Sequence, residues 1–360
     1  MRNILMIVFL GFLAAYSQAQ LKPGYDKAEA AELLKVNFRF VDSLRWDSLP
    51  GPERFEFKYR SPVLGFDNKW DYWEDKAGVG VLSLRGTTNN PTSWGANFYA
   101  GMVPAKGWIK ISEKDTFYYE LSKDPKALVH VGWTAALGCL WKDMDSLLFA
   151  KIDQGKKEFY ITGHSQGGAL AYLLTAHLLI MQENGIIPAD VRFKTYCSAA
   201  PKPGNLYFAY YYEKMTKQGW AYNTVNALDW VPESPFSIQT VTDFVAINPF
   251  QDAKKAIRKL PFFPQLVVMS MYKQMDRPSK KTQKRFEKNL GKRIGKLLSK
   301  KLEGFEPPKL SHSSAFTRCG NYIVLYPDVD YFIKYPQDPQ AKFMNHQLEP
   351  YLFMIDKLPE

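Results

Sequence analysis

A serine lies at the centre of a short glycine-flanked motif, Gly163-His164-Ser165-Gln166-Gly167, within the stretch YITGHSQGGALAYLLT. A serine in a G-x-S-x-G pattern can act as the nucleophile of an acyl-transfer reaction when a sharp turn between a strand and a helix presents its hydroxyl. The pattern alone occurs by chance in about one chain of this length in ten. Its sequence context therefore decides whether it predicts a nucleophile.

The residues on either side of this serine meet the requirements of such a turn. The strand-like stretch EFYI runs into the first glycine, and the helix-like stretch QGGALAYLLTAHLL follows the serine. The turn strains the serine backbone, so only very small residues fit two positions before and after it, as Gly163 and Gly167 do. We predict that Ser165 is a nucleophile in an elbow formed with Gly163, His164 and Gly167.

Two backbone N–H groups near this serine could stabilise an oxyanion. The N–H of Gln166 lies at the start of the following helix, where the helix dipole favours negative charge. A second donor is expected from a loop after an earlier strand, and Thr87 follows the buried-strand pattern of residues 78–86. Thr87 offers both an N–H and a hydroxyl, so we predict that Thr87 and Gln166 form the oxyanion hole.

The catalytic base is expected to be one of the five histidines in the chain. The chain order serine, acid, histidine excludes His130, and His177 lies within a helix pattern that predicts a packed or solvated side chain. His164 is adjacent to the nucleophile in sequence, but we expect its side chain to be directed away. His346 lies in a loop after the last strand-like stretch, where the base belongs, so we favour it over His312.

The acid that orients this histidine is expected at the end of a strand between Ser165 and His346. Asp229 occupies such a position in the stretch VNALDWVPESP, where a Trp-Val-Pro sequence stops the strand. A carboxylate at this position would hold the imidazole tautomer and stabilise the imidazolium. The residues therefore predict a catalytic triad of Ser165, His346 and Asp229.

Strand-like and helix-like stretches alternate along most of the chain. This alternation predicts an α/β fold with a mostly parallel central sheet flanked by helices. In open α/β sheets, functional sites lie at the carboxyl ends of the strands. Residues 234–310 break the alternation just after Asp229, and we interpret them as a helical, basic, cap-like insertion beside the site.

The N-terminal residues have the form of a secretory signal peptide. Arg2 is followed by an apolar run over residues 4–15 and by a small-x-small cleavage site that ends at Ala19. The run is too short for a membrane-spanning helix, so we favour a signal peptide (residues 1–19) over a membrane anchor. We expect residues 20–360 to form one exported domain, periplasmic or extracellular.

The positive charge is concentrated in one segment. The formal net charge is +11, whereas residues 254–309 contain 17 Lys and Arg and 4 Asp and Glu, a net of +13 that leaves about −2 for the rest. A single basic segment does not indicate that the whole protein binds nucleic acid, and we expect no such binding.

Six stretches, taken in order, resemble those of the class 3 lipases, the fungal-type triacylglycerol lipase family of the α/β-hydrolase fold. They are VLSLRGTT, VHVGW, FYITGHSQGGALA, SAAPKPGN, VNALDWVP and NHQLEPYL. The resemblance implies an α/β-hydrolase fold and the site roles already predicted. It assigns the triad and the oxyanion hole to Ser165, Asp229, His346, Thr87 and Gln166.

The resemblance also implies a lid. Residues 89–105 correspond to the family's mobile lid and carry the apolar side chains of Trp94, Phe98, Tyr99 and Met102. The long basic insertion departs from the compact members of the family.

The stretch KKTQKRFEKNLGKRIGKLLSKKL within the insertion predicts a basic amphipathic helix. Its apolar face contains Phe286, Leu290, Ile294, Leu297 or Leu298, and Leu302. The preceding stretch, LPFFPQLVVMSMY, is apolar and aromatic. Two interpretations stay open: residues 254–309 contact an anionic lipid surface, or the helix buries its apolar face on the enzyme body and leaves its lysines in water.

Together these features predict a secreted serine lipase or carboxylesterase that hydrolyses acyl esters of lipids, of the triacylglycerol type, through an acyl-enzyme. No metal or cofactor is expected, because the three cysteines have no metal-ligand spacing and the chemistry needs none. A phospholipase and a short-chain esterase remain alternatives within this class. A non-catalytic lipid-surface-binding homologue is the alternative outside it, and the oligomeric state stays open.

Overall fold

The structure is a computed structural model that describes residues 21–40 and 50–359. The predicted signal peptide, residues 1–19, lies outside the described residues. Within them, no helix combines the length and the apolar character needed to cross a membrane.

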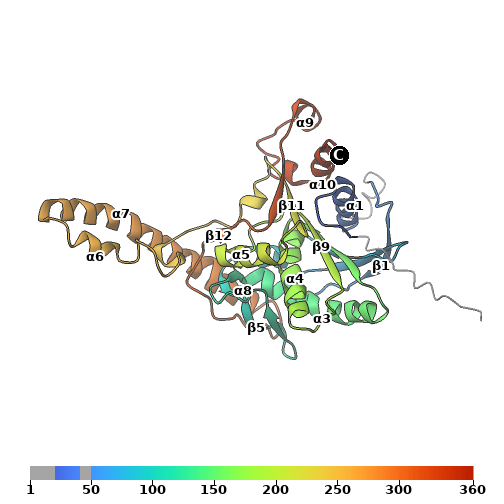
Figure 1. Cartoon of the computed structure of the whole chain (residues 1–360), viewed down its shortest axis with the longest axis horizontal. Coiled ribbons are helices and arrows are strands. Elements are labelled where there is room, and N and C mark those ends of the chain that lie inside the picture. Colours follow the sequence, from blue (N-terminus) through green and yellow to red (C-terminus); the bar gives the residue numbers. More distant parts are fainter. Residues whose placement is uncertain (1–20, 41–49, 360) are drawn as a thin grey trace, which may run out of the picture.

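A seven-stranded sheet forms the centre of the molecule, with the spatial order β1-β2-β3-β8-β9-β11-β13 (Figure 1). Its strands are β1 Phe55–Arg60, β2 Trp70–Asp75, β3 Gly80–Leu84, β8 Glu158–His164, β9 Arg192–Ser198, β11 Ala221–Asn226 and β13 Asn321–Leu325. The strands from β3 to β13 run parallel, whereas β1 and β2 are added antiparallel at one edge. The predicted mostly parallel sheet is therefore confirmed.

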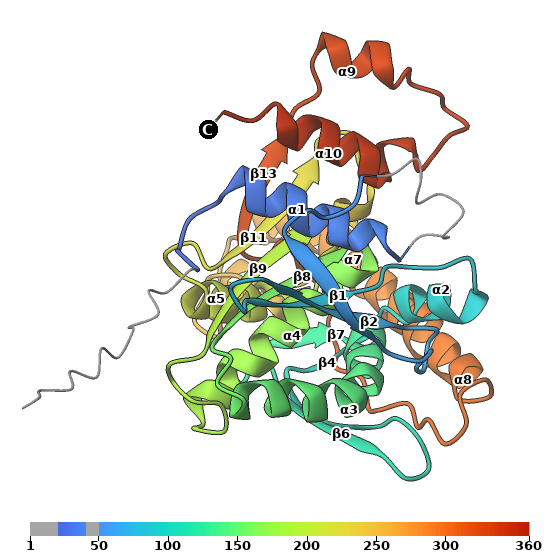
Figure 2. The ribbon, with the colours of Figure 1, turned by 90° about the vertical axis from the view of Figure 1, so that its right-hand side faces the viewer.

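Helices cover both faces of this sheet (Figure 2). They are α1 Lys27–Phe38 and α10 Leu348–Asp356 on one face, and α3 Val131–Asp153, α4 Gln166–Glu183 and α5 Leu206–Met215 on the other. Side chains alternate along each strand, so Leu82 and Ile161 pack toward α3 and α4, whereas Val81 and Tyr160 pack toward α1 and α10. Burial on both faces explains the near-continuous apolar composition of the central strands.

Two smaller sheets lie beside the central one. One has the order β12-β10-β7-β4 and the other is a β5-β6 hairpin. Their strands are β4 Met102–Pro104, β5 Lys106–Lys110, β6 Thr116–Glu120, β7 Leu128–His130, β10 Gly204–Asn205 and β12 Phe316–Thr317. Most of them are too short to produce an alternating pattern, and the sequence analysis did not predict them.

The insertion folds as a series of helices. After the turns η2 Val231–Glu233 and η3 Val241–Asp243, the chain forms α6 Ala253–Ile257 and α7 Phe262–Phe286, and then the π-helix η4 Glu287–Arg293 and α8 Ile294–Leu298. The chain later returns to the sheet at β13 and reaches α10 through α9 Val329–Lys334 and η5 Met344–His346.

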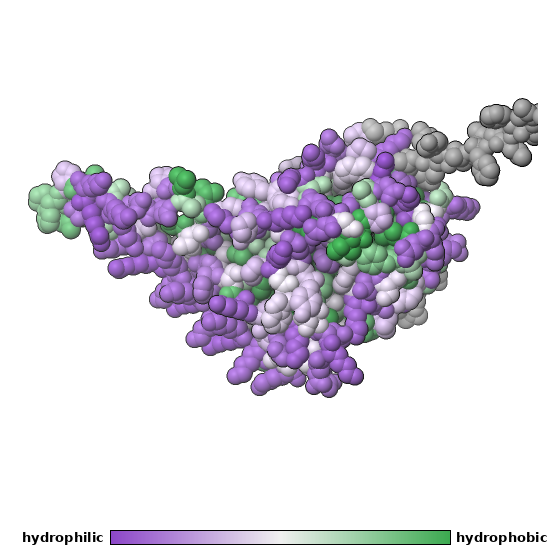
Figure 3. All heavy atoms as spheres, turned by 60° about the horizontal axis from the view of Figure 1, so that its bottom comes forward, coloured by the Kyte–Doolittle hydropathy of each residue, from purple (hydrophilic) through white to green (hydrophobic). Residues whose placement is uncertain are grey.

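The structure shows where the apolar face of the basic amphipathic stretch lies. Phe286 and Leu298 are buried, and Ile294 packs against the main core, so the apolar face is covered by the enzyme body. α8 packs against the helix α2 Pro91–Phe98. In contrast, α6 and the first half of α7 extend away from the body, with hydrophobic residues at their far end (Figure 3).

Candidate active site

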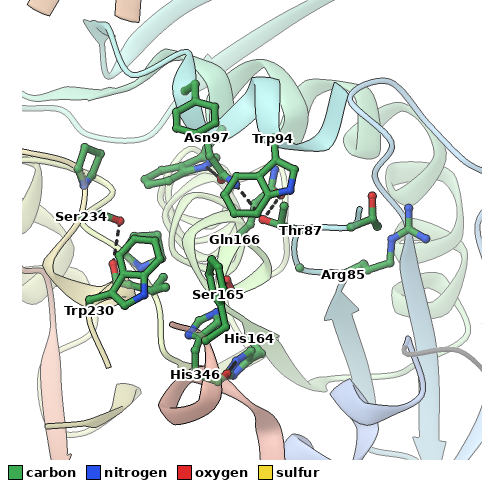
Figure 4. Close-up of a pocket in the computed structure, with 18 of the residues that line it drawn as sticks. Arg85, Thr87, Trp94, Asn97, His164, Ser165, Gln166, Trp230, Ser234 and His346 are labelled. Carbon is green, nitrogen blue, oxygen red and sulfur yellow. Dashed lines mark hydrogen bonds between the residues drawn. The ribbon is translucent and has the colours of Figure 1, made fainter. Parts of the chain in front are cut away.

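A cavity of about 1290 Å³ opens at the carboxyl ends of the central strands. The segments after β3, β8, β9 and β11 all contribute to its lining, as does the loop that carries His346 (Figure 4). This is the edge of the sheet where the sequence predicted the site, and Ser165, Thr87, Gln166 and His346 all line the cavity.

Ser165 lies in the turn between β8 and α4, with φ 60° and ψ −127°. A positive φ is unfavourable for a residue with a side chain, and such strain costs of order 1–3 kcal/mol. The surrounding glycines make the turn possible. A Cβ at Gly163 would overlap the carbonyl group of Gly167, and a Cβ at Gly167 would overlap the carbonyl oxygen of Leu84.

Ser165, His346 and Asp229 form a continuous hydrogen-bonded chain. The His346 Nε2 lies 2.8 Å from the Ser165 Oγ, and its Nδ1 lies 2.7 Å from the Asp229 Oδ2. With a proton on Nδ1, the imidazole donates to the carboxylate and accepts from the serine hydroxyl. This arrangement can remove the proton of Ser165 as its oxygen attacks a carbonyl carbon.

Asp229 is buried, and two further groups donate hydrogen bonds to its carboxylate oxygens. Its Oδ1 accepts from the Val231 N–H at 2.9 Å, and its Oδ2 also accepts from the Tyr351 hydroxyl at 2.8 Å. Burial, followed by the charge of Asp229, raises the pKa of Tyr351 well above its ordinary value, so this hydroxyl stays a donor. β11 ends at Asn226, so Asp229 lies in the turn beyond the strand rather than at its last residue.

The loop that carries His346 is tied to the body by side chains that the sequence analysis did not identify. The Asn226 Nδ2 donates to the carbonyl oxygen of Asn345, and the Trp230 Nε1 donates to that of Lys342, both at 3.0 Å. Because the partners are more than a hundred residues apart in the chain, no local pattern could have revealed these bonds.

His164 lies beside this loop, and it bonds the backbone of His346. Its Nε2 lies 2.9 Å from the carbonyl oxygen of His346, and its Nδ1 lies 2.9 Å from the Ser198 Oγ. Burial, and then the nearby His346, holds the pKa of His164 well below its ordinary value of 6.5. A neutral ring can donate to the carbonyl and accept from Ser198, so His164 positions the loop and is not itself placed to act on Ser165.

The remaining histidines lie away from the cavity lining. His312, the alternative base, has an exposed side chain whose Nδ1 lies 3.1 Å from a carboxylate oxygen of Glu287. His130 is buried at the start of α3, and His177 is buried between Phe117 and Trp141.

The two residues of the predicted oxyanion hole are linked to each other. The Thr87 Oγ1 donates to the Gln166 Oε1 at 2.9 Å and accepts from the Asn97 Nδ2 at 2.8 Å. The Trp133 Nε1 in turn donates to the Asn97 Oδ1 at 2.9 Å. Gln166 is the first residue of α4, so its N–H has no carbonyl partner within the helix and is free to face an oxyanion.

Asn97 is a site residue that the sequence analysis missed. It lies on α2 three positions after Trp94, which places both residues on the same face of the helix. That spacing was the available signal, because Trp94 was already predicted as a residue of the lid.

The predicted lid residues separate into two groups. Trp94 and Phe98 line the cavity from α2, and their rings stack with centroids 5.8 Å apart. Tyr99 and Met102 are fully buried and do not line the cavity, so they are core residues here and do not contribute to its wall. Tyr99 packs against Phe305 and α8, and Met102 belongs to β4, because the chain re-enters the core directly after α2.

Other apolar side chains complete the wall of the cavity. The insertion contributes Phe236, Phe286 and Leu290, and the turns next to Asp229 and His346 contribute Trp230 and Phe343. The insertion therefore helps to shape the cavity, although the sequence did not show which of its residues would do so. Across residues 21–40 and 50–359, no group of three His, Cys, Asp or Glu side chains could hold a metal ion.

The fold and the site together define an α/β-hydrolase with a serine-histidine-aspartate arrangement. The model of the lipase (class 3) family matches residues 81–239, which run from β3 past Ser165 and Asp229. The resemblance to the class 3 lipases noted in the sequence is therefore confirmed over this part of the chain.

Similar solved structures are lipases from fungi. They include the Rhizomucor miehei lipase propeptide complex (19% identity, 59% of this chain and 65% of that chain, TM-score 0.42). Another is the Lip2 lipase of Yarrowia lipolytica (20% identity, 58% of this chain and 72% of that chain, TM-score 0.43). A third is the lipase of Rhizopus microsporus var. chinensis (20% identity, 59% of this chain and 71% of that chain, TM-score 0.42). The match covers slightly less than two thirds of the first of these chains. Among curated proteins, none matches this sequence.

Proposed function

We propose that this protein is an exported serine hydrolase that cleaves acyl esters of lipids of the triacylglycerol type. The observation that carries the proposal is the continuous Ser165–His346–Asp229 chain, with atom separations of 2.8 Å and 2.7 Å, in a cavity with an aromatic and aliphatic wall. Export rests on the sequence pattern of residues 1–19. We also propose that residues 20–360 act as one domain whose insertion shapes the cavity.

In this mechanism the Ser165 Oγ attacks the carbonyl carbon of the ester while His346 accepts the hydroxyl proton. Asp229 holds the imidazole in the required tautomer and stabilises the imidazolium. The protonated His346 then donates to the leaving alkoxide, and an acyl-enzyme forms on Ser165. Water, deprotonated by His346, releases the fatty acid in the second half of the reaction.

The tetrahedral oxyanion would be stabilised by the N–H groups of Thr87 and Gln166. The Thr87 hydroxyl supports this arrangement, since it bridges Asn97 and the side chain of Gln166. Thr87→Val keeps the N–H donor and removes only the bridging hydroxyl, so it is expected to lower kcat by about 10-fold, the effect of losing one or two supporting hydrogen bonds, with a much smaller change in KM. Initial rates on a soluble ester give both constants.

The matched control is Thr87→Ser, which keeps the hydroxyl and removes only a methyl group. It should retain most of the activity. If Thr87→Val hydrolyses the ester as fast as the wild type, the Thr87 hydroxyl has no part in supporting the oxyanion hole.

The cavity also supports the choice of substrate. Its volume of about 1290 Å³ and its wall of Trp94, Phe98, Phe236 and Phe286 suit a long acyl chain better than an acetyl group. We expect kcat/KM on p-nitrophenyl esters to rise from acetate to medium and long chains, because each added methylene can be buried against this wall. Emulsified triacylglycerol should also be hydrolysed.

The same series distinguishes the alternatives. A maximum at acetate or butyrate would indicate a short-chain esterase. Release of fatty acid from phosphatidylcholine but not from triacylglycerol would indicate a phospholipase. Either result would contradict the proposed substrate while leaving the proposed chemistry in place.

A further inference from the structure

The insertion contains a helical arm with one side that no other part of residues 21–40 and 50–359 covers. The arm consists of α6 and residues 262–275 of α7, and it extends away from the enzyme body (Figure 1). α6 packs on one side of α7, where Lys254 lies near the ring of Tyr272 and 4.0 Å from Asp276. The body is reached only near the other end of α7, where Phe286 is buried and the helix continues into η4.

A row of apolar side chains runs along the outside of the arm. Phe263, Val267, Met271 and Met275 are spaced by four residues, which places them along one side of the helix. All four are exposed, Phe263 by 78% and Met275 by 74%. Exposed apolar side chains continue around the first turn of the helix, at Phe262 and Leu266. A contiguous exposed apolar surface of this kind marks an interaction site.

The segment that contains the arm is also strongly basic. Residues 252–286 contain ten Lys and Arg and two Asp, a net charge of +8, and five of the ten cations precede residue 276. Both aspartates are paired within this segment, Asp252 with Lys255 at 3.0 Å and Asp276 with Lys280 at 2.7 Å. The apolar row therefore lies in a segment with an excess of positive charge, and hydrophilic residues along the rest of the insertion are visible in Figure 3.

We propose that this arm attaches the enzyme to an anionic lipid surface. The apolar row would enter the boundary between headgroups and acyl chains, and the flanking lysines and arginines would contact the lipid phosphates. The inference deepens the proposed function, on which it rests, by naming the surface on which the lipid ester is found. It narrows the predicted lipid contact from residues 254–309 to residues 262–275, because the apolar face of residues 280–302 is covered by the body.

The arm is also connected to the cavity. α7 leads directly to Phe286, and η4 contains Leu290, and both of these side chains line the cavity. The helical path from Phe263 to Phe286 is about 35 Å long at 1.5 Å per residue. One continuous helical segment therefore joins the proposed lipid contact to the wall of the substrate site.

The positive charge and the apolar row together favour a lipid surface over a second copy of the chain or a nucleic acid as the partner of the arm. A second copy of this chain would bring another segment 252–286, of net charge +8, against the first, which costs electrostatic free energy. A nucleic acid would satisfy the cations but would leave the apolar row in water. An anionic lipid surface satisfies both features at once.

The test is sedimentation with vesicles of phosphatidylcholine containing phosphatidylglycerol, using the full chain and the Phe263→Ser/Met271→Ser variant. We expect the variant to partition into vesicles about tenfold or more weakly, because two exposed apolar side chains are lost from the contact. We also expect weaker binding of the wild type to vesicles of phosphatidylcholine alone and at high salt.

The matched control is Tyr118→Ser/Ile186→Ser, which removes side chains of similar exposure, 73% and 55% against 78% and 59%, from outside the arm. It should bind vesicles like the wild type. Hydrolysis of a soluble ester by the same preparations reports folding and the proposed function separately from lipid binding.

Three results would overturn the proposal. These are equal vesicle binding by the arm variant and the wild type, no binding by either, and a wild-type dimer that dissociates in the arm variant without any vesicle binding. The last result would assign the apolar row to self-association. Loss of ester hydrolysis in every preparation, with vesicle binding intact, would instead contradict the proposed function.

Discussion

Replacement of Ser165 by alanine is expected to lower kcat for ester hydrolysis by about 10⁶-fold. The Ser165 Oγ is the atom that His346 faces at 2.8 Å, and without it no acyl-enzyme can form. What remains is the contribution of the oxyanion donors and of substrate binding. Initial rates on a soluble ester measure the loss, and a fluorophosphonate probe should label the wild type and not the variant.

Ser146→Ala is the control for this experiment, because Ser146 is an exposed serine on α3, away from the cavity. It should keep full activity and full labelling. A Ser165→Ala protein that still hydrolyses the ester near the wild-type rate would show that another residue is the nucleophile. An unlabelled and inactive wild type would contradict the proposed chemistry as a whole.

Replacement of Asp229 by asparagine is expected to lower kcat by about 10⁴-fold. The Asp229 carboxylate accepts a hydrogen bond from the Nδ1–H of His346, and this tautomer leaves Nε2 as an acceptor toward Ser165. An amide NH₂ at this position favours the opposite tautomer, in which Nε2 carries the proton and cannot accept from Ser165. The same ester assay gives the rate, and thermal unfolding shows whether the variant is folded.

The Tyr351→Phe variant shows how much activity depends on a hydrogen bond to Asp229 rather than on the charge of Asp229. It removes only the bond between the Tyr351 hydroxyl and the Asp229 Oδ2, so we expect a smaller loss of about 10- to 100-fold. If Asp229→Asn costs no more than Tyr351→Phe, Asp229 supports the loop structure but is not the orienting acid of the triad.

Much of the candidate site could be predicted because its signals are local. The turn at Ser165 requires glycines at fixed offsets, a strand before it and a helix after it, and all of these are contiguous in the chain. Chain order and loop position then indicated His346 among the five histidines. The position of Asp229 at the end of a strand-like stretch indicated the acid. The parallel sheet could be predicted for a related reason, since strands buried on both faces are apolar along their whole length.

The supporting contacts could not be predicted, because they join residues that are distant in the chain. His164 bonds the carbonyl of a residue 182 positions away, and Asn226 bonds one that is 119 positions away. Neither bond has a signature in spacing or composition. They arise only when the sheet brings the ends of β8 and β11 next to the loop of His346.

Burial of the apolar segments was likewise decided by the tertiary structure. The sequence pattern showed an apolar face on the basic helix and apolar residues after Thr87. A pattern of apolar residues does not show which part of the protein, if any, packs against them. The body covers Phe286, Leu298, Tyr99 and Met102, and it leaves the row at Phe263 exposed. The sequence by itself determined which residues could do chemistry, since that depends on residue type and local backbone geometry. Only the tertiary structure decided which apolar surfaces stay free for a substrate or a lipid surface, because burial depends on long-range packing.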